Sequence, residues 1–214
     1  MRRSSPSPRG TASPTSRSRS RTTPPPVRLF LAINLPAPQR EAMYRAAAPL
    51  RAASRAIAWV AEERLHLTLK FLGDQRDEEA GRIARALAGV VSRHRPFDVE
   101  MSGAGAFPNF RRPRIVWMGV SDDPKLELLH NDVESVCAEL GHELDGRAFR
   151  AHVTLGRARR PLQGDETRAL HAAARGVRYL GTLDVRSVDV MQSELAAGGS
   201  RHALLSALPL EGGT

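Results

Sequence analysis

Two stretches of the sequence, RLHLTLKFLG at 64–73 and AFRAHVTLGRA at 148–158, decide the fold because they contain one shared pattern. HLTL at 66–69 and HVTL at 152–155 both consist of histidine, an apolar residue, threonine and a second apolar residue. Side chains alternate between the two faces of a strand, so His and Thr share one face and the apolar residues share the other. The pattern predicts one such strand in each half of the chain. Their apolar faces would lie in the core and their His–Thr faces would line a cleft.

The segments around these two stretches alternate irregularly between strand and helix patterns. Strands are predicted at 27–34, 56–60, 64–73, 97–107, 114–120, 148–158, 183–195 and 201–210, and helices at 36–54, 77–94, 124–141 and around 163–175. This order lacks the regular alternation of a doubly wound parallel sheet. The sequence therefore predicts an α+β fold with antiparallel sheets.

Composition sets the limits of the folded part. Residues 1–26 are rich in Ser, Pro and Arg, carry six arginines without an acid, and are predicted to be disordered. They would be an RNA-contacting arm, a transit peptide or, as the interpretation we favour, an unselected extension. Of the net charge of +9, residues 27–214 therefore keep only +3, which permits an anionic ligand without requiring one. We expect a single bilobal domain at 27–210 and a short tail at 211–214.

The single cysteine, Cys137, excludes an intramolecular disulfide and fits a reducing compartment, so a cytoplasmic protein is expected. Apolar residues recur around Cys137 at helical spacing, which predicts a buried core thiol rather than a nucleophile. No stretch of about 18 apolar residues occurs, so no membrane-spanning segment is predicted.

The paired motifs carry the residue types that phosphodiester cleavage needs. One group must deprotonate the attacking oxygen and another must protonate the leaving oxygen, and histidine suits both tasks near neutral pH. His66 and His152 are the candidate acid–base pair. The hydroxyls of Thr68 and Thr154 would donate hydrogen bonds to phosphate oxygens that gain charge in the transition state. This arrangement requires no metal and no cofactor.

Four segments together resemble one family. VRLFLAINLP, WVAEERLHLTLKFLGD, GAFPNFRRPRIVWMGV and FRAHVTLGRA are similar to the RNA 2′,3′-cyclic phosphodiesterase branch, also called 2′-5′ RNA ligase, of the 2H phosphoesterase superfamily. The resemblance covers about residues 27–210. It departs at Ala151, where this branch often has proline, and a residue before the histidine should point away from the cleft.

The resemblance implies two lobes related by a pseudo-twofold, each an antiparallel sheet backed by helices, with the active-site cleft between them. It also implies metal-independent opening of an RNA 2′,3′-cyclic phosphate to a 2′-phosphate, with possible reverse 2′-5′ ligation. By the same resemblance His66 is the proton donor and His152 the proton acceptor. The expected partner is RNA with a 2′,3′-cyclic phosphate or a 2′-5′ linkage, and the protein is expected to be a monomer.

Four further residues are candidates for substrate binding. Arg150 and Lys70 each lie two residues from a motif residue and should share its strand face, where Arg150 would hold a phosphate oxygen. In the segment 107–114, Phe107 and Arg112 would stack on a base and hold the RNA backbone. The alternatives are a solvated arginine at a strand end and an ordinary loop anchored by one phenylalanine.

Other classes of enzyme lack their signatures. A nucleic-acid ligase with a lysine nucleophile needs K-x-D-G, a P-loop enzyme needs G-x-x-x-x-G-K-[ST], and a zinc hydrolase needs clustered ligands. Two alternatives remain open: a 2H enzyme acting on a small cyclic nucleotide, and a non-catalytic protein that clamps RNA ends.

Overall fold

The computed structural model describes residues 26–76, 78–196 and 199–213. Residues 1–25 of the predicted disordered tail lie outside the described residues. Residues 211–213 continue the folded part beyond 210, because their backbone amides donate hydrogen bonds to the carbonyls of Ser92 and His94.

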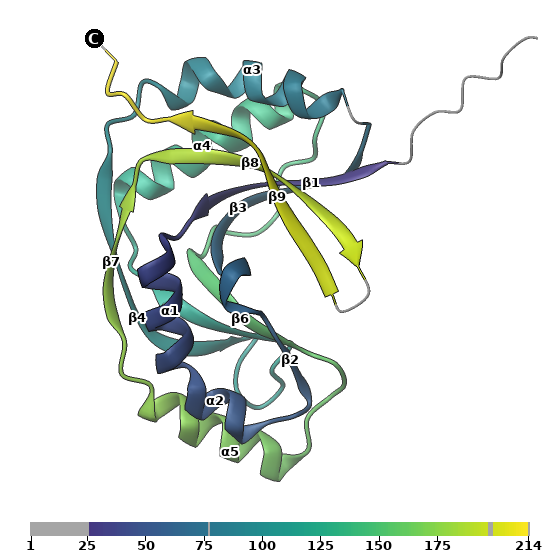
Figure 1. Ribbon diagram of the computed structural model, residues 1–214, viewed down its shortest axis with the longest axis vertical. Coiled ribbons are helices and arrows are strands. Elements are labelled where there is room, and N and C mark those ends of the chain that lie inside the picture. The colour runs from purple at the N-terminus through teal and green to yellow at the C-terminus, as the bar shows by residue number, and fades with distance from the viewer. Residues whose placement is uncertain (1–25, 77, 197–198, 214) are drawn as a thin grey trace, which may run out of the picture.

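The described strands form one curled antiparallel sheet in the order β7-β4-β5-β6-β3-β1-β8-β9, with β2 paired to β6 (Figure 1). The predicted α+β fold with antiparallel strands is confirmed. The strands are β1 (Val27–Asn34), β2 (Ile57–Trp59), β3 (His66–Gln75), β4 (Phe97–Phe107), β5 (Ile115–Val120), β6 (His152–Ala158), β7 (Leu180–Val185), β8 (Ser187–Ala196) and β9 (Gly199–Pro209).

Eight of the nine described strands form two four-stranded halves that meet at β3 and β6, and β2 adds to β6. One half is β3-β1-β8-β9 and the other is β7-β4-β5-β6, and their junction is the pairing of Leu67 with Val153. Both residues are fully buried. The first apolar residue of each motif therefore lies in the core, where the two halves are joined.

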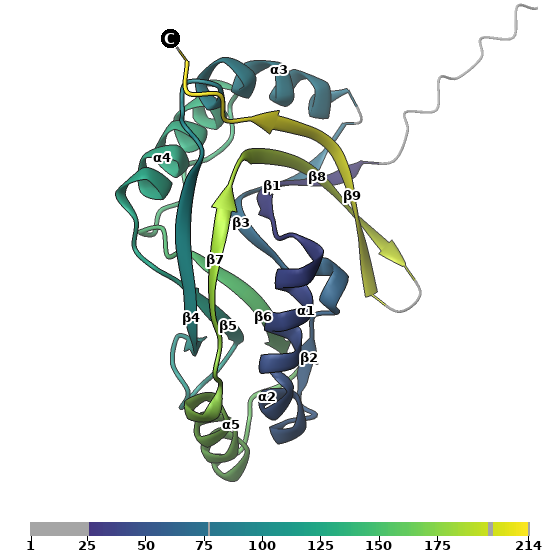
Figure 2. The ribbon, with the colours of Figure 1, turned by 60° about the vertical axis from the view of Figure 1, so that its left-hand side comes forward.

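Helices cover the sheet at opposite ends of the molecule (Figures 1 and 2). Helices α3 (Glu79–Val91) and α4 (Pro124–Glu139) pack together beside β3, β8 and β9. At the other end, α1 (Ala37–Ala46) leads into α2 (Ala48–Ala53), which packs on α5 (Gly164–Gly176). A 3-10 turn, η1 (Glu62–Arg64), precedes β3. Each half of the sheet therefore has its own helical layer.

Three predicted elements differ from the structure. The predicted strand 148–158 begins only at His152, because residues 148–151 form neither helix nor strand, so Arg150 precedes the strand on which it was predicted to lie. The predicted strand 183–195 is two strands, because β7 pairs with β4 in one half whereas β8 pairs with β1 in the other, and Arg186 lies between them. Both strands are partly buried, so the apolar pattern continues through the bend. The predicted helix 36–54 is divided at Ala47 into α1 and α2, and Pro49 lies in the first turn of α2. Among the described helices, none is both long and apolar enough to cross a bilayer.

Candidate active site

The junction of the two halves brings the two motifs side by side. Leu67 and Val153 are antiparallel partners, so the register places His66 opposite Thr154 and His152 opposite Thr68. Each histidine therefore lies next to the threonine of the other motif. The two halves supply equivalent side chains to one face of the sheet, as the sequence pattern predicted.

Matching β-bulges follow both motifs. In β3, Thr68 pairs with Ala32 and Lys70 pairs with Leu31, so Leu69 is the extra residue. In β6, Thr154 pairs with Trp117 and Gly156 pairs with Val116, so Leu155 is the extra residue. An extra residue shifts the following side chains to the opposite face. The two halves thus share the motif and the irregularity behind it, which supports their pseudo-twofold relation.

The bulge in β3 makes the predicted strand face of Lys70 wrong. Lys70 does not share the face of Thr68, because it lies on the helix side of the sheet and is only 2% exposed. Its Nζ donates to both carboxylate oxygens of Glu134, at 2.8 and 2.9 Å, and to the carbonyl of Glu143 at 2.8 Å. Lys70 still forms part of the cleft wall, but its charge is already paired and it has no donor left for a phosphate.

The bulge in β6 supplies a residue that sequence reasoning missed. Simple alternation places Arg157 on the face opposite Thr154, but after the bulge at Leu155 it lines the cleft together with Thr154. Arg157 carries a positive charge close enough to lower the pKa of both His66 and His152. In β3 the equivalent position is Phe71, which is 61% exposed. The repeated motif could have identified Arg157 from the sequence, but only if a β-bulge after the motif had been assumed.

Both catalytic candidates are oriented in the same way. A ring nitrogen of His66, Nδ1, lies 2.7 Å from the carbonyl oxygen of Arg64, and Nδ1 of His152 lies 2.6 Å from the carbonyl of Arg150. A carbonyl oxygen only accepts, so Nδ1 carries the proton in both neutral rings. Each Nε2 is therefore left unprotonated for proton transfer.

Burial lowers the pKa of both imidazoles. For His66 desolvation is the largest cause and takes the pKa to about 4; the Arg64 carbonyl opposes it, and the charges of His202, Arg157 and His152 add to it. The pKa of His152 is lowered by burial and by Arg157, against the Arg150 carbonyl. Both shifts favour the uncharged rings at neutral pH.

Aromatic rings surround each histidine. The ring of His66 lies 5.0 Å from that of Phe30 and 5.3 Å from that of His202. His152 meets Phe107 edge-on at 5.0 Å. These contacts exclude water from one side of each imidazole, and they account for the desolvation that lowers each pKa.

A cleft of about 1040 Å³ collects most of the predicted site residues. It is lined by His152, Thr68, Thr154, Arg150, Phe107, Arg112 and Arg157, together with every residue from Glu143 to Arg150. His66 is not among the lining residues, because its ring packs between Phe30 and His202. Arg112, Arg114, Arg147, Arg150 and Arg157 give the lining a positive excess over the carboxylates of Glu143 and Asp145.

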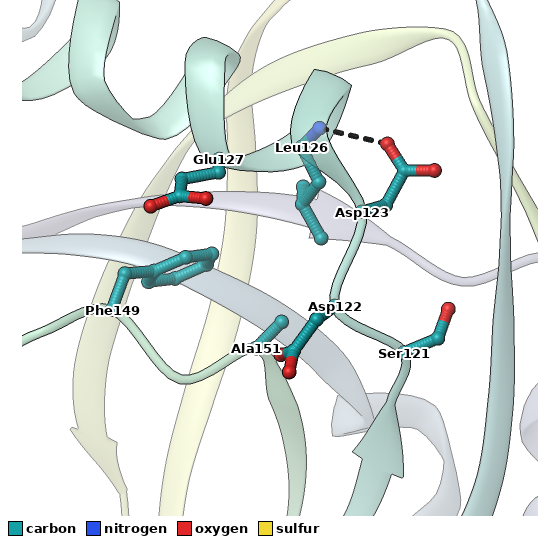
Figure 3. Close-up of a pocket in the computed structure, with 7 residues that line it drawn as sticks. All are labelled: Ser121, Asp122, Asp123, Leu126, Glu127, Phe149 and Ala151. Atoms are coloured by element: carbon teal, nitrogen blue, oxygen red, sulfur yellow. Dashed lines mark hydrogen bonds between the residues drawn. The ribbon is translucent and has the colours of Figure 1, made fainter.

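A second hollow of about 290 Å³ lies behind the motif of β6 (Figure 3). It is lined by Phe149 and Ala151, by Asp122 and Asp123 of the segment before α4, and by Glu127 of the first turn of α4. Ala151 is therefore outside the main cleft, in agreement with the expectation that the residue before His152 points away from it.

The single thiol lies away from the cleft. Cys137 is fully buried, as predicted, and burial raises the pKa of its thiol to about 11, which disfavours the thiolate. In the described part of the chain, no three His, Cys, Asp or Glu side chains gather as metal ligands would.

Comparison with known proteins connects this geometry to one group of enzymes. The family described as LigT like Phosphoesterase matches residues 33–117. A protein of Archaeoglobus fulgidus named RNA 2′,3′-cyclic phosphodiesterase is 35% identical over 81% of this chain and 94% of its own length. A protein of the same name from Geobacillus stearothermophilus is 34% identical over 68% of this chain, which spans about half (47%) of that relative. The crystal structure of Escherichia coli LigT complexed with 3′-AMP superposes with a TM-score of 0.65 and 29% identity, covering 86% of this chain and 98% of that one.

Proposed function

This chain belongs to the LigT-like 2H phosphoesterases, and on that premise we propose that it is a cyclic phosphodiesterase that opens RNA 2′,3′-cyclic phosphate ends to 2′-phosphates. The observation that carries the proposal is the pair of identically oriented imidazoles beside two threonines. Two relatives that this chain matches over most of their length are named RNA 2′,3′-cyclic phosphodiesterase.

The reaction follows from the free nitrogens of the two rings. Nε2 of His152 takes a proton from water as its oxygen bonds to phosphorus, and protonated His66 gives its proton to the departing 3′-oxygen. The P–O3′ bond breaks, leaving a 3′-hydroxyl and a 2′-phosphate. Proton exchange with solvent then returns the two histidines to their starting states. No step requires a metal.

The surrounding residues stabilise the charge on the phosphate. Thr68 and Thr154 donate hydrogen bonds to its non-bridging oxygens, and the guanidinium groups of Arg157 and Arg150 offset their charge. Without a bound anion His66 is neutral at pH 7, because its pKa is about 4. A bound phosphate anion favours the imidazolium, so substrate binding would itself promote the protonation of His66. A 5′-hydroxyl in place of water would give 2′-5′ ligation by the same steps.

The positive lining favours RNA over a small cyclic nucleotide, since five arginines line a cleft that a single phosphate would occupy only in part. Phe107 offers a ring for stacking and Arg112 a cation for the backbone. We further propose that the protein acts as a cytoplasmic monomer.

The test is the incubation of the protein in EDTA with a short RNA that ends in a 2′,3′-cyclic phosphate. His66→Ala and His152→Ala are compared with His171→Ala, a control in α5 whose ring stacks on Phe110. We expect 2′-phosphate from the wild type and the control, and at least about a thousandfold less from the two motif variants. Turnover of a cyclic mononucleotide alone would support the small-nucleotide alternative. RNA binding without any turnover, unaffected by the two substitutions, would support the clamp.

A further inference from the structure

The second half of the site depends on a loop that has no regular structure. Residues 143–150, the 143–150 loop, form neither helix nor strand, and every one of them lines the cleft. The loop ends at Arg150, whose carbonyl orients His152 at 2.6 Å. The orientation of that imidazole is therefore only as well defined as the position of the loop.

The first half solves the same problem with a short helix. Arg64, whose carbonyl orients His66, ends the 3-10 turn η1, and its own amide donates to the carbonyl of Ala61. The Arg64 guanidinium also donates to the carbonyl of Ser200 in β9 at 2.7 Å. The residue that supplies the carbonyl behind His66 is thus fixed by local hydrogen bonds, whereas within the described residues Arg150 makes no such bond with its own amide or guanidinium.

Three buried side chains supply the missing support. Lys70 Nζ donates to the carbonyl of Glu143 at 2.8 Å, and Glu134 accepts the backbone amide of Asp145 at 3.2 Å. The ring of His130 stacks on Phe149, with centroids 3.9 Å apart and planes at 13°. Lys70, Glu134 and His130 are only 2%, 7% and 5% exposed. The loop is therefore held near its start, its middle and its end from the core.

We propose that Lys70, Glu134 and His130 form a positioning cluster that holds the 143–150 loop and, through the Arg150 carbonyl, sets the orientation of His152. Lys70 is in this view a positioning residue and not a substrate ligand. Its three N–H groups have three acceptors, two on Glu134 and one on Glu143. A buried ion pair adds little stability over apolar side chains of similar size, so its contacts with the loop are the better account of its role. The catalytic consequence rests on the function proposed above.

The variant that separates position from stability replaces both charges, Lys70→Met with Glu134→Met. Removing both leaves no unpaired buried charge, so the melting temperature should stay within a few degrees. The control, His94→Leu with Asp132→Leu, removes another polar side-chain pair that involves α4, in which His94 Nε2 lies 2.9 Å from Asp132 Oδ2. Neither residue lies in the 143–150 loop or lines the cleft.

We expect the double methionine variant to lower kcat on a short RNA that ends in a 2′,3′-cyclic phosphate at least about tenfold, because small misplacements of a catalytic group are costly. Trypsin should cleave after Arg147 or Arg150 at least about tenfold faster, since the loop is no longer held. The acidic limb of the kcat/KM profile should move to lower pH, because the Arg150 carbonyl raises the pKa of His152, against burial and the charge of Arg157. The control should behave as the wild type in all three measurements.

A folded double variant with wild-type kcat and wild-type resistance to trypsin would overturn the proposal. If that variant does not fold, amide exchange in the wild type decides: the Asp145 amide should exchange at least about tenfold more slowly than that of Gly146, and equal rates would refute the link to Glu134. If the wild type turns over no cyclic phosphate, the proposed function fails, while proteolysis and exchange still test the positioning cluster.

Discussion

Protonation of His66 should couple the stability of the protein to pH. The pKa of this ring falls from 6.5 to about 4 on folding, chiefly through desolvation. The unfolded chain therefore binds a proton on His66 between these values and the folded protein does not. Stability is fully present above pH 6.5 and is lost as the pH falls toward 4.

The size of the effect follows from the two pKa values. Between pH 7 and pH 5 the unfolded state gains about 2 kcal/mol relative to the folded state from this group alone, at 1.36 kcal/mol per pKa unit. The substitution His66→Asn isolates it, because the Asn amide is placed to donate to the Arg64 carbonyl but does not titrate. Other titrating groups remain in both proteins, so their contributions cancel to first order.

Urea unfolding of the wild type and His66→Asn at pH 7 and pH 5 measures the four free energies of unfolding. The wild type should lose about 2 kcal/mol more than the variant between the two pH values. Equal losses in both proteins would mean that His66 titrates normally when folded. The description of His66 as a desolvated ring packed between Phe30 and His202 would then be incorrect.

Two further predictions concern the second half of the site. Arg157→Ala should raise the KM for RNA about tenfold or more, because the variant loses a guanidinium that binds the phosphate. The NMR titration midpoints of His66 and His152 should rise, because Arg157 lowers both pKa values. Unchanged midpoints would place Arg157 away from the two rings. Gly156→Ala should lower the free energy of unfolding by about 1–3 kcal/mol in urea denaturation, since an added Cβ would lie 2.5 Å from Cγ2 of Ile57, and a wild-type value would show that β2 gives way.

The sequence was sufficient for the parts of the fold that depend on alternation. The repeated His–Thr pattern predicted two equivalent strands with the histidines on a common face, and the junction of Leu67 with Val153 realises that arrangement. Apolar periodicity likewise located the helices that back the sheet. These features can be read locally, because a strand or helix with one buried face needs apolar residues at regular spacing along its own sequence.

The structure departs from the sequence reasoning where alternation is interrupted. A bulge adds a residue without leaving a signal in composition, so Lys70 was assigned to the cleft face and Arg157 was overlooked. The division of 183–195 at Arg186 was missed for a related reason, since both resulting strands keep their own apolar faces. Pairing with neighbouring strands determines where the bulges and the division at Arg186 occur. Those neighbours are far apart in the chain, so the pattern of one segment cannot identify them.

The two halves of the cleft differ most behind their bulges, and this difference bears on the proposed chemical roles. Position for position, Lys70 and Phe71 of β3 correspond to Gly156 and Arg157 of β6, so the second half alone presents a cation to the phosphate. Desolvation is the largest cause that lowers the pKa of His66, whose ring packs between Phe30 and His202, and the charges of His202 and Arg157 add to it, so its imidazolium is strongly disfavoured. An imidazolium that is disfavoured is a strong acid once a phosphate anion has loaded it. The asymmetry therefore supports His66 as the donor to the leaving oxygen and leaves His152, held by the 143–150 loop, as the base.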